Sequence, residues 1–566
     1  MTVQNNNNGR PEVCFSYEWS NGCSFVAKAD SFDIVRGREV YFSFPVSCAL
    51  VLEKAEDRDT AVSFKEAQSL SGGAKVVWSA KSPVMGDKEY TARITGEGVA
   101  FGVKQLSAPA SADTVKEIKF FAGAEGKRAA NYFMSRYMLP ANDCSDRENS
   151  TYAVGTDRDL IPGMLCPAPF VFPFENEFDD TRIGIGFAAP AGANSFTRMG
   201  VCFKKPVEMW FRIPYPTAAG VTAAYVFPAA FICFGSDAYD VISRWADWAR
   251  REFRYPEKKR TAVPDWWRSP IFCGWMEQDQ RARATGLDTK ELSTQEEYER
   301  MRSRMERAGL RPGIIIIDDK WQVDYGTMTV DRKKWPDMRA FTDDCHARGQ
   351  RVLLWWRLWN PDGLPGDACA KDRGVTVCAD PCSDGYRERI RQALRVLLGS
   401  GEGEMNCDGF KLDYIYRIPD DRLGIRFSGG NPQGIELMRE YYKFIYDAVK
   451  EIKPDALVNT SFAHPYFDDC FDQIRLHDYD SIQRETVTQM TRRANTVRAV
   501  YPGCLIDTDG GNALTGRPEP LLRHNRAAVK IGSPALYTLT PLSDEDLREI
   551  QRTWDEYTRR LSGRSE

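Results

Sequence analysis

The sequence predicts two architectures in one chain, an N-terminal all-β sandwich followed by a (β/α)8 TIM barrel. Up to Gly235 the chain shows short β-type runs that are broken by Gly, Pro, Asn and Asp. After Asp265, apolar runs alternate with longer amphipathic segments, the pattern of βα units around a parallel sheet. With 566 residues, the chain has room for both, because a domain takes roughly 100–200 residues.

The all-β part is expected to occupy residues 1–236. Its β-type runs are Val40–Phe44, Lys75–Ser79, Ile183–Phe187, Met209–Ile213 and Tyr225–Phe234. Residues 237–253 then have helical spacing, and the charged stretch Tyr255–Val263 resembles an exposed connection. We therefore predict a linker helix and connection over 237–264 and a catalytic barrel over 265–566.

The barrel is predicted from eight strand-like runs that can be counted along the chain. They are Ile271–Trp275, Gly313–Asp318, Arg351–Trp356, Asp408–Asp413, Ala456–Asn459, Asp472–Leu476, Gly503–Asp507 and Pro534–Thr538. Amphipathic helical segments lie between most of them. One helix start is marked by Ser293 and Glu296, which have the spacing of a capping box, and that helix is expected to end at Gly309.

Composition excludes several classes of function. The 76 Lys and Arg nearly balance the 80 Asp and Glu, so that a net charge of -4 predicts neither a nucleic-acid partner nor a charged membrane surface. No apolar run approaches the length of a membrane span, and the N-terminus lacks a secretory pattern, which together predict a cytoplasmic protein. With four His and no HExxH motif, we expect no metal and no cofactor. The sequence leaves open whether the protein forms a homo-oligomer.

Carboxylates gather at the predicted carboxyl ends of four strands, where barrels carry their chemistry. They are Asp318 and Asp319 after the second strand, Asp413 in the fourth, Asp478 and Asp480 after the sixth, and Asp507 and Asp509 at the seventh. Strand alternation puts Lys411 on the same face as Asp413, and an adjacent ammonium would keep that carboxylate ionised. Asp318 and Asp319 could instead cap a helix, and the Lys411–Asp413 pair could be purely structural.

Tryptophans lie near the same strand ends. They are Trp275, Trp335, Trp355, Trp356 and Trp359, although adjacent strand residues face opposite ways and some of these rings must serve packing. Carboxylates accept hydrogen bonds from sugar hydroxyls, aromatic faces stack on sugar rings, and a carboxyl pair can cleave a glycosidic bond. The combination predicts a sugar substrate, either an oligosaccharide or another glycoside.

Six segments in order resemble the α-galactosidases of glycoside hydrolase family 36, in clan D with families 27 and 31. The segments are IIIIDDKWQ, KKWPDM, RVLLWWRLWNP, FKLDY, DQIRLHDYDSIQR and HNRAAVKIGSPALYTLTPLSDEDL. The resemblance covers the predicted barrel, and a preceding β-sandwich is also the layout of that family.

The resemblance implies a retaining exo-acting α-galactosidase with Asp413 as nucleophile and Asp478 as acid/base. It further implies that Asp318, Asp319 and Lys411 hold the sugar. Trp321 and Trp356 are expected as subsite walls. By residue chemistry alone, Asp507 and Asp509 remain rivals of Asp478 as the proton donor.

Departures from the family pattern leave the identity of the substrate sugar undetermined. The strand-five segment reads TSFAHPYFDD where the family has a Gly-rich stretch, and Arg475 stands where the family has a tryptophan. We expect His464 and Arg475 to bind a 2-substituent or an acidic group, although His464 could be a loop histidine with a local partner.

Alternative activities are cleavage of an α-glucoside or α-N-acetylgalactosaminide, or transglycosylation. Non-catalytic carbohydrate binding and phosphate chemistry are less favoured, since both motif aspartates are present and the last two strand loops lack a clear Gly-rich anion cradle.

Overall fold

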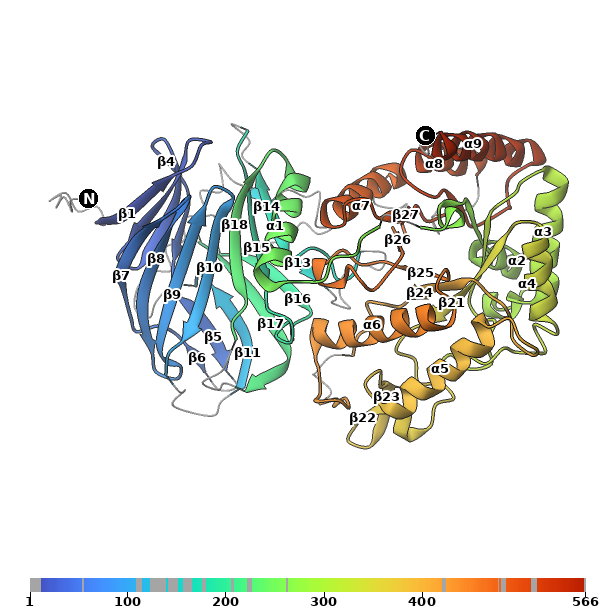
Figure 1. The fold of residues 1–566 in the computed structure, drawn as a ribbon, viewed down its shortest axis with the longest axis horizontal. Helices are drawn as coiled ribbons and strands as arrows, with labels where there is room; N and C mark the ends of the chain where they lie inside the picture. Colours follow the sequence, from blue (N-terminus) through green and yellow to red (C-terminus); the bar gives the residue numbers. More distant parts are fainter. Residues whose placement is uncertain are drawn as a thin grey trace.

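The computed structural model describes residues 12–52, 55–107, 114–122, 139–140, 151–155, 165–175, 180–204, 208–220, 226–260, 263–419, 424–476, 478–479, 485–510 and 517–563. Twisted β-sheets form one end of the molecule and a barrel surrounded by helices forms the other (Figure 1). Helix α1 (Ala238–Phe253) lies between the two. The expected order, an all-β part followed by a (β/α)8 barrel, is confirmed.

The described residues of the N-terminal part form three sheets. The four-stranded sheet consists of β1 (Val13–Glu18), β2 (Cys23–Lys28), β3 (Ser31–Arg36) and β4 (Glu39–Pro45), in that order. The eight-stranded sheet has, in spatial order, β12 (Leu139–Pro140), β14 (Val171–Glu175), β15 (Arg182–Ala188), β18 (Ala229–Gly235), β10 (Gly98–Gln105), β9 (Gly86–Thr95), β8 (Gly73–Ser82) and β7 (Ala61–Leu70). The six-stranded sheet has β13 (Thr151–Gly155), β16 (Arg198–Lys204), β17 (Glu208–Gly220), β11 (Thr114–Phe120), β5 (Cys48–Leu52) and β6 (Glu56–Asp57).

Period-two burial explains how these sheets pack. Along β2, buried and half-buried side chains alternate, so that one face enters the core. Aromatic rings fill that core: Phe32 lies 5.1 Å from Phe25 and 5.3 Å from Phe44, measured between ring centroids. Burial of such rings is the main driving force for stacking the sheets.

Helix α1 connects the two parts by packing against both. Asp237 caps its N-terminus by accepting hydrogen bonds from the backbone amides of Tyr239 and Asp240. Trp245, which is fully buried, donates its indole N–H to the carbonyl of Phe187 in β15. The apolar face of α1 thus contacts the eight-stranded sheet, while α1 also contacts α7 (Thr486–Val500) of the barrel.

The segment after α1 is only partly the exposed connection that its charge predicted: Glu257 and Lys259 are exposed, whereas Lys258 and Arg260 are half-buried. Lys258 binds Asp472 at 2.7 Å, and Arg260 pairs with Asp468. Their side chains are only 20% and 10% exposed. Lys258 and Arg260 form ion pairs with barrel carboxylates, and these pairs hold the connection against the barrel.

The barrel sheet contains eight parallel strands, one for each predicted run. They are β19 (Ile271–Cys273), β20 (Ile314–Ile317), β21 (Arg351–Arg357), β24 (Gly409–Asp413), β25 (Leu457–Thr460), β26 (Gln473–Arg475), β27 (Leu505–Asp507) and β28 (Ala535–Leu536). The spatial order is β27-β26-β25-β24-β21-β20-β19-β28. A parallel bridge between Asp507 and Ser533 links β27 to the segment before β28, which brings the two sheet edges together.

Helices cover the outside of this sheet. They are α2 (Trp275–Thr285), α3 (Gln295–Ala308), α4 (Met338–Ala347), α5 (Asp384–Leu398), α6 (Gly434–Ile452), α7, α8 (Pro518–Ala528) and α9 (Asp544–Ser562). A small hairpin, β22 (Cys369–Asp372) with β23 (Val375–Ala379), lies in the connection between β21 and α5. No helix in the described ranges is long and apolar enough to cross a bilayer.

The predicted cap of α3 is wrong by one residue. Thr294, not Ser293, is the N-cap, and its hydroxyl accepts from the amide of Glu297 at 3.2 Å. Ser293 is buried and donates to the carbonyl of Asp318 at 2.9 Å. The Ser and Thr are adjacent, and burial of Ser293 beside β20 leaves Thr294 to cap the helix, which ends at Gly309 as predicted.

Side chains along the barrel strands alternate between the interior of the barrel and the layer under the surrounding helices. Interior residues form one apolar cluster that includes Ile271, Ile314, Leu353, Leu457 and Tyr537. The residues between them, such as Ile315, Leu354 and Phe410, join the larger core under the helices. Inward-facing residues at the carboxyl ends of the strands therefore meet above the interior cluster, and we call this end of the barrel the mouth.

Candidate functional site

Asp413 ends β24 at the mouth, where three donors from the described part of the chain hold it. The indole of Trp355 donates to its Oδ2 at 2.9 Å, and the backbone amide of Tyr414 donates to its Oδ1 at 2.8 Å. Arg475 donates to Oδ1 at 3.1 Å. The Asp413 side chain is 18% exposed. It is thus an oriented carboxylate that is still accessible from the mouth.

Arg475, at the end of β26, connects three aspartates through one guanidinium. Besides Asp413, it binds Oδ2 of Asp509 at 2.9 Å and lies 3.8 Å from Oδ1 of Asp478. Its side chain is only 1% exposed. Burial disfavours the charged form, but the charges of Asp413 and Asp509 outweigh this effect and raise the pKa of Arg475. Arg475 is therefore a fixed cation between strands β24, β26 and β27.

The carboxyl end of β20 does not supply an exposed pair of carboxylates. Asp318 is buried and receives the ammonium of Lys411 at 2.8 Å, the thiol of Cys273 at 3.0 Å and the amide of Asp319 at 2.9 Å. Burial alone would lower the pKa of Lys411, but the Asp318 charge raises it above its ordinary value. The predicted partner of Lys411 was Asp413. The structure pairs Lys411 with Asp318 and assigns Arg475 to Asp413.

Asp319 lies at the mouth, and its surroundings disfavour the ionised form of its carboxyl group. Its Oδ1 accepts a 2.8 Å hydrogen bond from the hydroxyl of Tyr325. Burial raises the pKa of Asp319 to about 6, and the neighbouring Asp318 adds to this shift. A carboxyl group with this pKa changes its protonation near neutral pH, which is common among functional groups.

The two aspartates of strand seven are buried. Asp507 accepts from Asn459 at 3.0 Å and from the amide of Asp509 at 2.9 Å, and burial raises its pKa to about 6. Asp509 is held by Arg475, and its backbone carbonyl contacts Nε2 of His524 at 2.9 Å. Both residues have no exposed surface. In contrast, the Asp478 side chain is 37% exposed.

Three predicted binding residues do not lie at the mouth. Trp321 is fully buried, and its indole donates to the carbonyl of Trp355 at 2.8 Å. Trp356 follows the outward alternation of β21 and packs against Phe410 under the helices. Neither ring can form the wall of a subsite, because each is sealed in the core.

His464 is the third of these. It has no exposed surface and lies against Phe170 and Trp245, at ring distances of 5.2 and 5.5 Å. These neighbours belong to the N-terminal part and α1. Burial lowers the pKa of His464 to about 3, so that the ring is neutral at physiological pH. His464 is a packing residue between the two parts, which corresponds to the local-partner alternative.

Of the other predicted residues, Asp480 and the loop beyond it lie outside the described residues. The structure brings Asp319, Asp413, Asp478 and Arg475 together at the mouth, and it places Asp318 and Lys411 just beneath them as a buried pair.

Sequence reasoning missed three residues that shape the mouth and gave a fourth no specific role. Trp355 was proposed only as one of several aromatic surfaces, whereas Arg357, Tyr325 and Tyr414 were not singled out. The register could have revealed Arg357, since it pairs with Asp413 across β21 and β24 while Trp355 pairs with Lys411. Alternation over WWRLW therefore puts Trp355 and Arg357 on the inner face.

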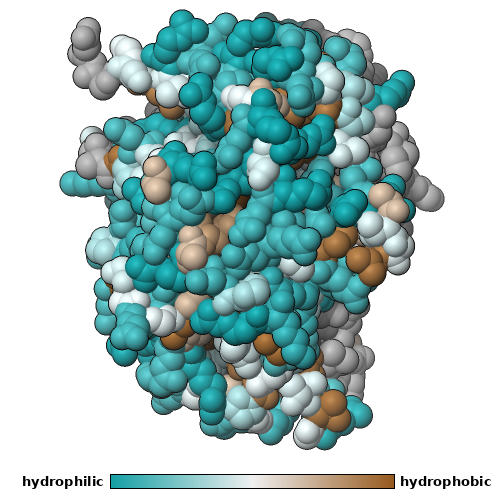
Figure 2. All heavy atoms as spheres, turned by 90° about the vertical axis from the view of Figure 1, so that its right-hand side faces the viewer, coloured by the Kyte–Doolittle hydropathy of each residue, from teal (hydrophilic) through white to brown (hydrophobic). Residues whose placement is uncertain are grey.

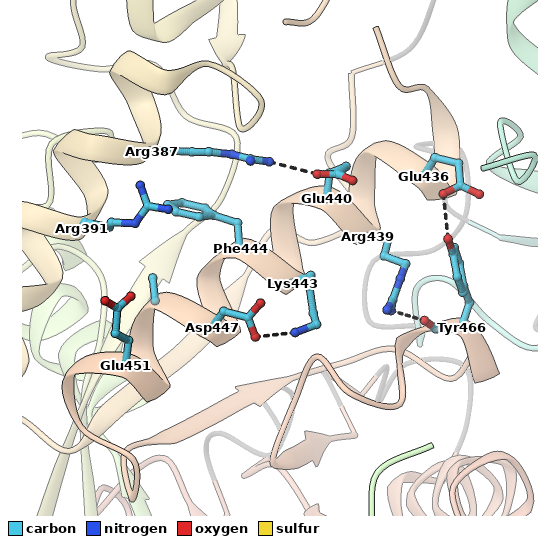
Figure 3. Close-up of a pocket in the computed structure, with 11 residues that line it drawn as sticks. Arg387, Arg391, Glu436, Arg439, Glu440, Lys443, Phe444, Asp447, Glu451 and Tyr466 are labelled. Carbon is cyan, nitrogen blue, oxygen red and sulfur yellow. Dashed lines mark hydrogen bonds and ion pairs between the residues drawn. The ribbon is translucent and has the colours of Figure 1, made fainter. Parts of the chain in front are cut away.

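A hollow of about 410 Å³ lies between α5 and α6 and is also lined by Tyr466 (Figure 3). Opposite charges line it: Arg387 binds Glu440 at 3.0 Å, and Lys443 pairs with Asp447. Arg391 stacks on Phe444 at 5.2 Å. Two of its carboxylates are therefore neutralised by basic residues of the same hollow.

The mouth has the parts required for acid–base and nucleophilic chemistry. One oriented carboxylate and a second, more exposed one lie around a single cation. No group of three or more residues suited to hold a metal ion occurs in the parts of the chain that the structure describes.

Comparison with known proteins places the barrel among glycoside hydrolases. The "Glycosyl hydrolases family 31 TIM-barrel domain" matches residues 281–371. An "A type blood alpha-D-galactosamine galactosaminidase" of Flavonifractor plautii is 23% identical over 180 residues, 27% of this chain and 16% of that protein. The "Alpha-xylosidase XylQ" of Lactiplantibacillus pentosus is 24% identical over 162 residues, 25% of this chain and 20% of that protein. The matches therefore span a fifth or less of either relative.

Solved structures show a similar fold over most of the chain. A family 31 sulfoquinovosidase from E. rectale, in complex with an aza-sugar inhibitor, superposes with a TM-score of 0.58 at 12% identity and covers 94% of this chain and 82% of its own. The family 36 α-galactosidase AgaB from Geobacillus stearothermophilus gives a TM-score of 0.53 at 13% identity, with coverage of 95% and 84%.

The fold, the mouth and these matches define a glycoside hydrolase barrel preceded by β-sheets. More particularly, the chain resembles the clan that unites families 31 and 36, and the comparisons do not single out family 36.

Proposed function

We propose that this protein is a retaining, exo-acting glycoside hydrolase that cleaves terminal α-galactosides. The observation that carries this proposal is the pair Asp413 and Asp478, which reach the mouth from β24 and the end of β26 and share the guanidinium of Arg475. Two carboxyl groups on opposite sides of a glycosidic bond suffice for hydrolysis without a cofactor.

In the proposed mechanism, Asp413 attacks the anomeric carbon while Asp478 donates a proton to the leaving oxygen. A glycosyl ester on Asp413 results, and Asp478 then removes a proton from the water that cleaves this ester. The contacts of Asp413 support the first role. Trp355, Arg475 and the Tyr414 amide keep its carboxylate oriented, and they leave it accessible from the mouth.

Exposure favours Asp478 over its two rivals as acid/base. An acid/base residue must reach both the leaving group and a water molecule. Asp507 and Asp509 are fully buried and committed to Asn459 and Arg475, whereas Asp478 is partly exposed. The surroundings of Asp319 suit it to hold a glycone hydroxyl, because one of its oxygens already accepts a hydrogen bond from Tyr325 at the mouth.

The same mechanism on another α-linked sugar is the second candidate. The curated relatives are named as a galactosaminidase and an α-xylosidase, and a structural neighbour as a sulfoquinovosidase. An α-glucoside, an α-N-acetylgalactosaminide or transfer to a second sugar would use the same two carboxylates.

The test is hydrolysis of a panel of aryl α-glycosides: galactoside, glucoside, N-acetylgalactosaminide and xyloside. Asp413→Ala should reduce turnover at least about 10³-fold, because the nucleophile cannot be replaced by binding energy. Asp478→Ala should be rescued by azide on an activated aryl glycoside, which needs no proton donor for departure. Azide rescue of Asp509→Ala instead would move the acid/base role to strand seven.

Two outcomes separate the parts of the proposal. Release from a sugar other than galactose would retain the mechanism and change the specificity. Near-normal turnover by Asp413→Ala would refute the nucleophile assignment.

A further inference from the structure

Three cations and three tyrosines form a continuous stack at the mouth. Lys320 lies over the ring of Tyr325 at 4.4 Å. Arg357 lies over Tyr325 at 4.8 Å and over Tyr414 at 4.4 Å. We call the set the cation–tyrosine rim; it consists of Lys320, Tyr325, Arg357, Tyr414, Arg417 and Tyr416, with Arg417 over both Tyr414 and Tyr416 at 5.7 and 5.4 Å.

The rim directly adjoins the proposed catalytic carboxylates. Arg357 pairs in register with Asp413, and Tyr414 follows Asp413 in the chain. Tyr325 donates to Asp319 at 2.8 Å. The positive charge of Arg357 also acts on Asp319, where it opposes the upward pKa shift caused by burial. A substrate in the mouth therefore meets the rim and the two carboxylates together.

The rim cations differ from the other cations of the site in their partners. Lys411 is bound to Asp318 and Arg475 is bound to Asp413 and Asp509. In contrast, Lys320, Arg357 and Arg417 form no ion pair with a carboxylate among the described residues. They contact tyrosines instead: Lys320 and Arg357 lie over rings, and Arg357 and Arg417 also hydrogen-bond the side chains of Tyr325 and Tyr416. Stacking orients a guanidinium without neutralising it.

An oriented guanidinium that forms no ion pair is suited to bind an oxyanion, since its planar N–H groups match two oxygens at once. We infer that the substrate is an α-glycoside with an anionic substituent, a carboxylate or a sulfate, which Arg357 binds while Lys320 and Arg417 add positive potential. This inference rests on the proposed function and specifies its substrate class. It would also explain why cations gather beside a site that contains several carboxylates.

The test measures binding separately from turnover. Calorimetry compares galactose with galacturonate and galactose 6-sulfate, and glucose with glucuronate and glucose 6-sulfate. At least one anionic sugar should bind about tenfold more tightly or better than its neutral counterpart, and the advantage should shrink as salt rises. The carboxylate and sulfate arms identify which oxyanion is preferred.

Arg357→Met should abolish this advantage, whereas Arg357→Lys should retain part of it. Arg391→Met is the matched control, because Arg391 is likewise stacked on an aromatic ring, Phe444, but lies on α5 (Figure 3). Melting temperatures of the variants verify folding. Equal binding of neutral and anionic sugars by the wild type, or an advantage that persists in Arg357→Met, would overturn the inference. Cleavage of neutral aryl glycosides tests the proposed function independently of either result.

Discussion

At the scale of one residue, Asp319 illustrates how burial moves the pKa of a carboxyl group towards neutral pH. Its ordinary pKa is 3.8, and burial raises it to about 6. Between these values the folded protein binds more protons than the unfolded chain, so that stability falls as pH rises through this window. At neutral pH the ionised, buried carboxylate therefore destabilises the fold.

Asp319→Asn should stabilise the protein at pH 7.5 by about 1–3 kcal/mol, because the amide removes the buried charge and can still accept from Tyr325. The gain should disappear near pH 4, where the wild-type carboxyl is largely protonated. Turnover should fall at the same time. Melting temperatures at both pH values test this, and a gain that is equal at pH 4 and 7.5 would contradict it.

Trp355 is a second residue with a specific role, because its indole nitrogen donates a hydrogen bond to Asp413. Trp355→Phe keeps most of the ring but removes the indole donor to Asp413. Hydrogen bonds to charged groups contribute about 1.5–3 kcal/mol, and kcat should therefore fall roughly 10- to 100-fold. Trp356→Phe on the outer face is the control and should leave kcat unchanged while it lowers the melting temperature.

At the scale of single elements, strand register decides which residues meet. Arg357 faces Asp413 and Arg475 faces Asp507 because parallel pairing aligns β21 with β24 and β26 with β27. Alternation along each strand was readable from the sequence and placed Lys411 and Asp413 on one face. The pairing of Lys411 with Asp318, from a strand far away in sequence, was not readable, because it requires the spatial order in which β24 and β20 flank β21.

The start of α3 gives an element-scale prediction. Thr294→Ala should destabilise the protein by about 1 kcal/mol through loss of the cap to Glu297. Ser293→Ala should affect the β20 end instead, because Ser293 donates to the carbonyl of Asp318. Melting temperatures and turnover of both variants separate the two effects: only Ser293→Ala should change turnover. A loss of turnover in Thr294→Ala alone would contradict this assignment.

At the scale of the whole molecule, α1 and the segment after it bind the β-sheets to the barrel. Lys258 and Arg260 bind barrel carboxylates, and His464 packs against Trp245 of α1. The face of the barrel end in Figure 2 is mostly hydrophilic, with small and separate apolar patches.

His464 makes this junction sensitive to acid. Its pKa is lowered from 6.5 to about 3, and the unfolded chain therefore binds more protons than the folded protein between these values. Stability should fall as pH drops from 6.5 to 4.5, by about 2–3 kcal/mol from this residue. His464→Asn, which keeps an acceptor for the Tyr466 amide, should lose less stability over the same interval. Parallel slopes of melting temperature against pH would contradict the prediction.

By itself, the sequence determined the order of an all-β part and a barrel, the eight barrel strands and the carboxylates at their ends. These features follow from local periodicity, which is written in neighbouring residues. Only the tertiary structure decided that Arg475 joins Asp413, Asp478 and Asp509, that Trp321, Trp356 and His464 are buried, and that Arg357 stacks between Tyr325 and Tyr414. The physical reason is that burial and ion pairing depend on segments that are distant in sequence. The order of the barrel strands and the packing of the two parts against each other bring these segments together.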